Sequence, residues 1–300
     1  MGLFSDELIE HLDVGYINLR DGQSKIERQI VETLENMWTQ YSDYADPDFR
    51  AGFARDPESR FWEMYLGCTL LESGKQLLRT EERQATGGNP DLCVLNNGRR
   101  IWIEAIAPGE GDEGGFTLPE GYQRILRHAP TREVQLRISS ALWTKTKIIR
   151  RYRDCGDIAE NDVSIVAVGA AKFGINAGGP GIPLPLSTVF PIGPNFVRLD
   201  STTLEVVDEG YQHSFEIPRE NGPNIPRTAF LDTQFQHVAG LIWSRASIGN
   251  MNRSQRPLTF VHNPVALKPL EVGWGVWDRE YVASKRENEY IVDDILYQTN

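Results

Sequence analysis

Cysteine and histidine are both scarce in this chain. Its 300 residues include three cysteines and five histidines. An odd number of scattered cysteines does not form a disulfide framework, so we interpret Cys68, Cys93 and Cys155 as reduced packing residues in a reducing compartment. The histidines lack the spacing of zinc ligands, which argues against a zinc cage.

Long apolar runs are also missing. No stretch of eighteen apolar residues occurs, and no charged segment followed by an apolar one opens the chain. Both absences argue against secretion and against a membrane span. We therefore expect a soluble, cytoplasmic protein that has no membrane partner.

Basic residues are fewer than acidic ones. Lysine and arginine number 31 against 42 aspartates and glutamates, which gives a net charge of −11. This balance excludes a protein that coats nucleic acid over its whole surface, but it leaves room for a local basic groove. The densest basic segment runs from Lys145 to Arg153.

The remaining pattern alternates between helical and strand-like segments. It predicts helices over residues 1–50, 56–73 and 131–154, and strands over 91–106, 163–168, 240–244 and 258–262. Glycine-rich, proline-rich or polar composition predicts irregular segments over 109–115, 174–194 and 249–254. Without a repeat or a boundary signal, we expect one domain over 1–300, divided into a helical extension (1–50), a core (58–170) and a C-terminal elaboration with further sheet strands (171–300).

The most informative segment contains Asn97-Gly98 between two β-prone runs. This dipeptide is typical of a two-residue hairpin turn, in which both positions have positive φ. Residues 96 and 99 then pair, and the same register places Asp91 opposite Glu104. Their Cβ atoms are expected about 4.5–5.5 Å apart on one face of the hairpin. That face also carries Cys93 and Trp102, and the other face carries Leu92, Val94, Ile101 and Ile103.

Two carboxylates that face each other destabilise a sheet unless something compensates their charge. Mg²⁺ or Mn²⁺ would do so, because hard cations take carboxylate oxygens as ligands. The alternative is that Asp91 and Glu104 lie at a frayed sheet edge that is exposed to water.

Twelve residues separate Pro90-Asp91 from Glu104, which lies in the strand-like run Ile101-Trp-Ile-Glu104-Ala-Ile106. This pattern resembles the PD-(D/E)XK nuclease superfamily. The resemblance covers about residues 58–170. It implies a restriction-endonuclease-like α/β fold: a mixed central sheet flanked by helices, with helical N-terminal and irregular C-terminal elaborations. It also implies that Asp91 and Glu104 bind the metal, with the Ala105 carbonyl as a further candidate ligand. Glu63, in the preceding helical segment, matches an additional acid of the family.

The sequence departs from the family at one position, because Ile106 replaces the lysine that assists the attacking water. Residues of the 131–154 helix form an apolar stripe at a spacing of 100° per residue: Val134, Ile138, Ala141, Leu142, Ile148, Ile149 and Tyr152. Lys145 falls within this stripe and Lys147 on the opposite side. Lys145 therefore resembles a catalytic lysine that has moved to the following helix. The alternative is a lysine at the helix edge whose ammonium reaches water.

The resemblance implies a metal-dependent endonuclease that hydrolyses phosphodiester bonds in nucleic acid, with DNA as the expected partner. The candidate catalytic residues are Glu63, Asp91, Glu104 and Lys145. The candidate phosphate contacts in a local basic groove are Lys147, Arg150, Arg151 and Arg153.

Two other functions stay open. A catalytically inactive binding or assembly module is favoured by Ile106 and by the acidic net charge. A metal-dependent hydrolase of a small phosphorylated molecule would need no broad basic surface. We interpret His262 as structural and Trp274 and Trp277 as packing residues. The oligomeric state stays open, a homodimer included.

Overall fold

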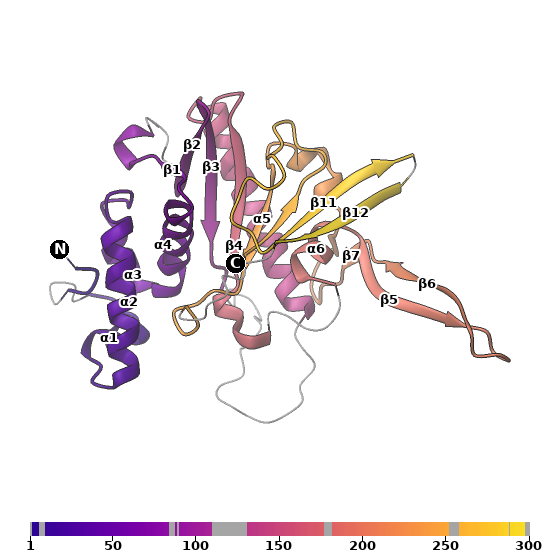
Figure 1. Cartoon of the computed structure of the whole chain (residues 1–300), viewed down its shortest axis with the longest axis horizontal. Helices are drawn as coiled ribbons and strands as arrows, with labels where there is room; N and C mark the ends of the chain where they lie inside the picture. The colour runs from indigo at the N-terminus through magenta and orange to yellow at the C-terminus, as the bar shows by residue number, and fades with distance from the viewer. Residues whose placement is uncertain are drawn as a thin grey trace.

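The computed structural model describes residues 2–5, 10–83, 88, 90–109, 131–176, 182–251, 258–287 and 289–297, without the side chains of residues 174–176 and 289. The described chain is a mixed α/β protein built on an eight-stranded sheet with the order β1-β2-β3-β4-β9-β10-β11-β12. Helices flank this sheet (Figure 1). The expected mixed central sheet with flanking helices is confirmed.

Four helices precede the sheet: α1 (Val14–Asp21), α2 (Lys25–Tyr41), α3 (Phe49–Arg55) and α4 (Pro57–Glu72). Ser24 begins α2 with a capping box, in which its hydroxyl accepts from the Glu27 N–H and the Glu27 carboxylate accepts from the Ser24 N–H. Asp56 caps α4, and Gly74 follows that helix with a φ of 76°. The predicted helical N-terminal region and the predicted second helix are confirmed.

The sheet begins with an antiparallel meander of β1 (Gln76–Leu77), β2 (Leu92–Asn96) and β3 (Arg99–Ile106). Asn97 and Gly98 join β2 to β3 with φ values of 51° and 77°, as the predicted turn requires. Asn96 pairs with Arg99, and the register continues without a shift to Leu92 and Ile103. The predicted hairpin and its register are confirmed.

Further strands complete the sheet. β4 (Val163–Gly169) lies parallel to β3, and β9 (Gly240–Ser244) lies parallel to β4. β10 (Leu258–His262) is antiparallel to β9 and parallel to β11 (Arg279–Arg286), which pairs with β12 (Glu289–Leu296). The strands predicted near residues 163, 240 and 258 are confirmed, and one sheet takes strands from residue 76 to residue 296.

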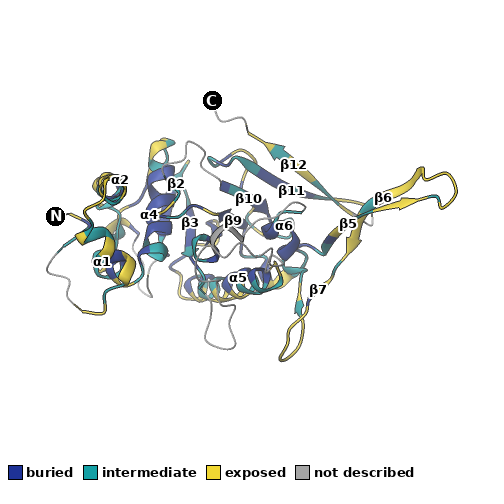
Figure 2. Ribbon diagram, turned by 90° about the horizontal axis from the view of Figure 1, so that it is seen from below, coloured by how far each residue is buried: buried dark blue, intermediate teal, exposed yellow. Residues whose placement is uncertain are grey.

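Separate hydrophobic cores lie on the two faces of the sheet. Leu92, Val94, Ile101 and Ile103 belong to the core that includes α2, α3 and α4. Cys93 and Trp102 belong to the core that includes α5 (Thr131–Asp154) and α6 (Leu184–Val189). The predicted division of the hairpin into two faces is therefore confirmed, and α5 matches the predicted helix. Figure 2 shows that buried residues gather in α4 and the central strands.

The segment predicted to be irregular between 174 and 194 contains α6 and the start of β5 (Ile192–Leu199), so that prediction is wrong in part. Proline interrupts a helix in its interior, but Pro183 precedes α6 and Pro185 lies in its first turn. A missing N–H costs no helical hydrogen bond there. Residues 177–181 of this segment lie outside the described residues. So do residues 110–115 and 252–254 of the other two predicted loops.

The C-terminal elaboration is also more regular than expected. β5 and β6 (Val206–His213) form a hairpin that projects from the body (Figure 1), and β7 (Glu216–Ile217) pairs with β8 (Ile225–Pro226). Much of the β5–β6 hairpin is exposed, so its apolar residues, such as Val197 and Leu199, follow no in–out alternation that a sequence could reveal. In the β11–β12 pair, acidic residues such as Asp293 and Asp294 interrupt the apolar pattern.

The remaining short elements are the 3₁₀ turns η1 (Thr80–Glu82), η2 (Ala171–Asn176), η3 (Ala229–Leu231) and η4 (Thr233–Phe235). Trp274 and Trp277 are buried in the core, as predicted. His262 is buried at the end of β10 with its ring edge-on to Phe260, which fits the structural role expected of it. None of the described helices is long and apolar enough to cross a membrane.

Candidate active site

Three charged side chains from separate elements meet beside the β2–β3 hairpin. Asp91 immediately precedes β2, Glu104 lies in β3, and Lys145 lies in α5. The Lys145 Nζ is 2.6 Å from Glu104 Oε2 and 3.5 Å from Asp91 Oδ2. One ammonium group therefore bridges the two carboxylates that the hairpin register brings together.

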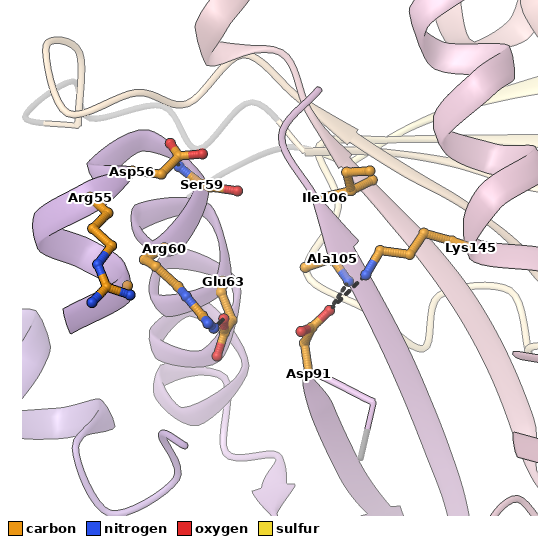
Figure 3. A pocket seen from close by; sticks show the side chains of 10 residues that line it. Arg55, Asp56, Ser59, Arg60, Glu63, Asp91, Ala105, Ile106 and Lys145 are labelled. Atoms are coloured by element: carbon orange, nitrogen blue, oxygen red, sulfur yellow. Dashed lines mark hydrogen bonds and ion pairs between the residues drawn. The ribbon is translucent and has the colours of Figure 1, made fainter. Parts of the chain in front are cut away.

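The carboxylate of Asp91 is held in place by the neighbouring strand. Its Oδ2 accepts a hydrogen bond of 2.7 Å from the Ala105 N–H, and Figure 3 shows this contact beside the one to Lys145. The backbone of the same segment is held by Arg83, whose guanidinium donates to the Pro90 and Asp91 carbonyls at 3.1 and 3.0 Å.

Arg83 is a positioning residue that the sequence did not reveal. It is fully buried, and it also donates to the carbonyls of Leu78 and Tyr44. Its partners are backbone oxygens from separate parts of the chain, so no acidic residue at a characteristic spacing points to it.

Glu104 is in a low-dielectric environment. Its side chain is 4% exposed, and burial, together with the nearby charge of Asp91, raises its pKa to about 7. Lys145 is 15% exposed. Burial on its own lowers the pKa of Lys145, but Asp91 and Glu104 outweigh it and hold that pKa above the ordinary value. Lys145 therefore stays protonated at neutral pH.

These burial values decide between the alternatives left open by the sequence. The side chains of Asp91 and Glu104 are 23% and 4% exposed, so the pair is not a frayed edge in water. The ammonium of Lys145 contacts the carboxylates and does not extend to solvent as an edge lysine would. Lys147 is exposed, with its Nζ 5.3 Å from the centre of the Trp143 ring. The predicted opposite orientation of the two lysines is confirmed.

Glu63 approaches from α4, across from Lys145. Its Oε1 accepts from the Tyr41 hydroxyl and its Oε2 from Arg60 Nη1, both at 2.8 Å. Burial and then the charge of Asp91 raise the pKa of Glu63 to about 7. Burial and the Glu63 charge also hold the pKa of Tyr41 well above its usual range. The charge of Asp91 therefore acts on Glu63, while hydrogen bonds from Tyr41 and Arg60 hold the Glu63 carboxylate.

A pocket of about 430 Å³ lies between these elements. One wall comes from α3 and α4, and the other comes from β3 and α5 (Figure 3). Its lining residues are Gly52, Arg55, Asp56, Ser59, Arg60, Glu63, Asp91, Ala105, Ile106 and Lys145. Ile106 lines this pocket, so the position at which the nuclease superfamily has its lysine does face the site. Lys145 brings an ammonium group to the same pocket from α5.

The four basic candidates that follow Lys145 differ in what their side chains contact. Arg151 is exposed, and its charge lowers the pKa of Glu104, whereas burial raises that pKa. Arg150 donates to the Gln234 carbonyl. Arg153 donates to the Ala159 and Asp162 carbonyls at 3.2 and 2.8 Å, so its guanidinium is used to anchor the segment before β4. Of the four, Arg151 is the one whose charge lowers the pKa of Glu104.

The donor set fits a hard divalent cation. Asp91 and Glu104 supply only oxygen ligands, and both carboxylates reach one positive centre. Within the described residues no group of three or more acidic, histidine or cysteine side chains forms a metal cage. Mg²⁺ is commonly bound by one or two carboxylates, with water and substrate phosphate completing its shell, so two carboxylates suffice.

Comparisons of this chain with protein-family models, with curated proteins and with solved structures found no match. The resemblance to the nuclease superfamily is therefore limited to the motif around Asp91 and Glu104.

Proposed function

We propose that this protein is a metal-dependent nuclease of the PD-(D/E)XK type, with a restriction-endonuclease-like fold, that hydrolyses phosphodiester bonds in DNA. The observation that carries the proposal is the position of Lys145. Its Nζ lies 2.6 Å from Glu104 and 3.5 Å from Asp91, at the pocket where Ile106 replaces the motif lysine. An ammonium at this place can both balance the two carboxylates and act on a phosphate bound in the pocket.

In this proposal Asp91, Glu104 and the Ala105 carbonyl hold Mg²⁺ or Mn²⁺. The bound cation supplies a lowered water pKa and stabilises negative charge on the phosphate. Asp91 is preorganised, because the Ala105 N–H binds its carboxylate and the Arg83 guanidinium binds its backbone carbonyl. Preorganisation of this kind is what a site needs to stabilise charge as it develops.

Lys145 orients the attacking water or neutralises the negative charge that develops on the phosphate. Its amino group stays protonated, and its long side chain reaches the pocket from α5 although the residue is not part of β3. Glu63 helps to place water on the opposite wall, where Tyr41 and Arg60 fix its orientation. Arg151 contributes a phosphate contact beside Glu104, and Lys147 and Arg150 extend the basic surface along α5.

A hydrolase of a small phosphorylated molecule is the second candidate. It is favoured by a net charge of −11 and by a pocket of about 430 Å³ with walls on two sides. An inactive binding module is favoured by Ile106 and by the net charge of −11, whereas the ammonium of Lys145 in the pocket supports an active site.

The test combines metal binding with cleavage. Titration calorimetry with Mn²⁺ measures binding to the full chain and to Asp91→Asn. Plasmid and single-stranded DNA are then incubated with Mg²⁺ or Mn²⁺, and the products are resolved on gels. Metal binding with DNA cleavage supports the nuclease. Metal binding with hydrolysis of small phosphate esters alone supports the second candidate, and no metal binding contradicts both.

A further inference from the structure

The pocket contains three cations, and they differ in what they contact. Lys145 is bound by Asp91 and Glu104, and Arg60 is bound by Glu63 at 2.8 Å. Arg55 also lines the pocket, yet its guanidinium forms no ion pair or hydrogen bond with any residue that the structure describes. It is therefore the pocket cation whose charge is not already neutralised by those residues.

The local structure explains why Arg55 stays unpaired. It is the last residue of α3 and is exposed, and Asp56 follows it directly. Asp56 cannot neutralise it, because the Asp56 carboxylate caps α4 through the Ser59 N–H and pairs with Lys172 at 2.6 Å. The chain thus holds a guanidinium on the pocket wall formed by α3 and α4, while the acid next to it in the sequence is bound by Ser59 and Lys172.

Arg55 and Lys145 lie on opposite walls. Figure 3 shows Arg55 on the α3 side and Lys145 on the α5 side, with Arg60, Glu63 and Asp91 between them. A phosphate beside Asp91 and Glu104 is within reach of Lys145, so a group bound by Arg55 belongs to a different part of the substrate. A guanidinium recognises phosphate through two parallel N–H donors, which is the geometry that an unpaired arginine offers.

We propose that Arg55 binds the phosphate next to the scissile one in a nucleic-acid strand. This inference rests on the proposed nuclease function and narrows its substrate. A pocket with a second phosphate contact selects a strand that carries consecutive phosphates, and it gives no advantage to a molecule that has a single phosphodiester.

The experiment compares two substrates that differ in this feature. One is a short DNA oligonucleotide, and the other is bis(4-nitrophenyl) phosphate, which has one phosphodiester and no neighbour. Arg55→Gln should lower kcat/KM for the oligonucleotide at least about tenfold more than for the small diester, mainly through KM, because it removes a charge-assisted hydrogen bond. Arg28→Gln makes the same change on an exposed face of α2, outside the pocket lining, and serves as the matched control.

A neutral methylphosphonate identifies the phosphate that is contacted. Placed next to the scissile position on one side, it should lower cleavage by the wild type and cause no further loss in Arg55→Gln. If Arg55→Gln lowers kcat/KM equally for both substrates, or for neither, the proposed contact with the neighbouring phosphate is wrong while the nuclease proposal stands. If the wild type cleaves neither substrate with Mg²⁺ or Mn²⁺, the proposed function fails, and this inference fails with it.

Discussion

The ammonium of Lys145 lies 2.6 Å from the carboxylate of Glu104, although the two residues are 41 positions apart and belong to a helix and a strand. In the nuclease motif the lysine is two residues after the glutamate, on the same strand. Here that strand position holds Ile106, and the ammonium comes from α5, which packs on the face of the hairpin that carries Cys93 and Trp102. In the proposed nuclease, α5 supplies the cation that β3 lacks.

The first prediction contrasts Lys145 with Lys147. Lys145→Met should reduce DNA cleavage by about 10²–10³-fold, because it removes a fixed charge at the reacting centre. It should still fold, since methionine keeps most of the apolar stem and Glu104 can take up a proton. Lys147→Met removes an exposed charge and should cost only salt-dependent DNA affinity. Cleavage rates and far-UV circular dichroism of both variants provide the measurement, and equal cleavage by the two would contradict the role of Lys145.

The second prediction concerns metal binding. Saturating Mn²⁺ should raise the melting temperature of the wild type, because a ligand that binds only the folded state stabilises it by about 2.7 kcal/mol at one hundred times Kd. Asp91→Asn should lose this gain and yet fold, since its amide oxygen can still accept from the Ala105 N–H. Asp208→Asn, in the exposed β5–β6 hairpin, is the control and should respond as the wild type does. A shift that survives in Asp91→Asn would place the metal elsewhere.

The candidate site could be predicted where local rules determine the geometry. Asn97-Gly98 allows one tight turn, and that turn fixes which residues of β2 and β3 pair. Helical phase then separates Lys145 from Lys147 without any knowledge of the tertiary structure. These steps need only the covalent geometry of the backbone and the side-chain period of each element.

The rest of the site depends on contacts between distant segments. Arg83 reaches the Asp91 carbonyl and the Tyr44 carbonyl at once, and nothing in its neighbourhood marks such a role. The Tyr41 hydroxyl donates to Glu63 only because α2 packs on α4. The β5–β6 hairpin was not predicted because it has few contacts with the rest of the chain that would bury one of its faces. Its residues are largely exposed, so burial does not impose a period on them.

The third prediction tests whether Arg83 positions Asp91. Arg83→Met leaves the buried carbonyls of Leu78, Pro90, Asp91 and Tyr44 without their donor, so the free energy of unfolding should fall by about 3 kcal/mol or more. Mn²⁺ affinity should fall with it, because the segment that carries Asp91 is no longer fixed. Arg79→Met is the control: Arg79 is half exposed, and its pair with Asp43 is worth at most about 1 kcal/mol. Urea unfolding and Mn²⁺ titration decide the matter, and equal losses in the two variants would contradict it.

The fourth prediction concerns Glu58, in the first turn of α4. Burial is the main cause that raises its pKa from 4.5 to about 7, and its carboxylate accepts from the Ile248 N–H. Below pH 4.5 the group is protonated in both states. Between pH 4.5 and about 7 the unfolded chain releases this proton while the folded chain keeps it, so stability falls as the pH rises through this window. At pH 8 the ionised side chain therefore costs the folded state about 3 kcal/mol.

Glu58→Gln removes this cost, because glutamine stays neutral and can still accept from the Ile248 N–H. The variant should match the wild type near pH 4.5 and exceed its free energy of unfolding by up to about 3 kcal/mol at pH 8. Glu27 is the matched control in the first turn of α2, and its pKa is lowered by the Ser24 hydroxyl. Glu27→Gln should therefore lose stability at pH 8, the opposite sign. Urea unfolding of the three proteins from pH 4.5 to 8.5 measures both effects. A Glu58→Gln curve that runs parallel to that of the wild type would show that the pKa of Glu58 is the same in the folded and the unfolded chain, and the burial argument would then be wrong.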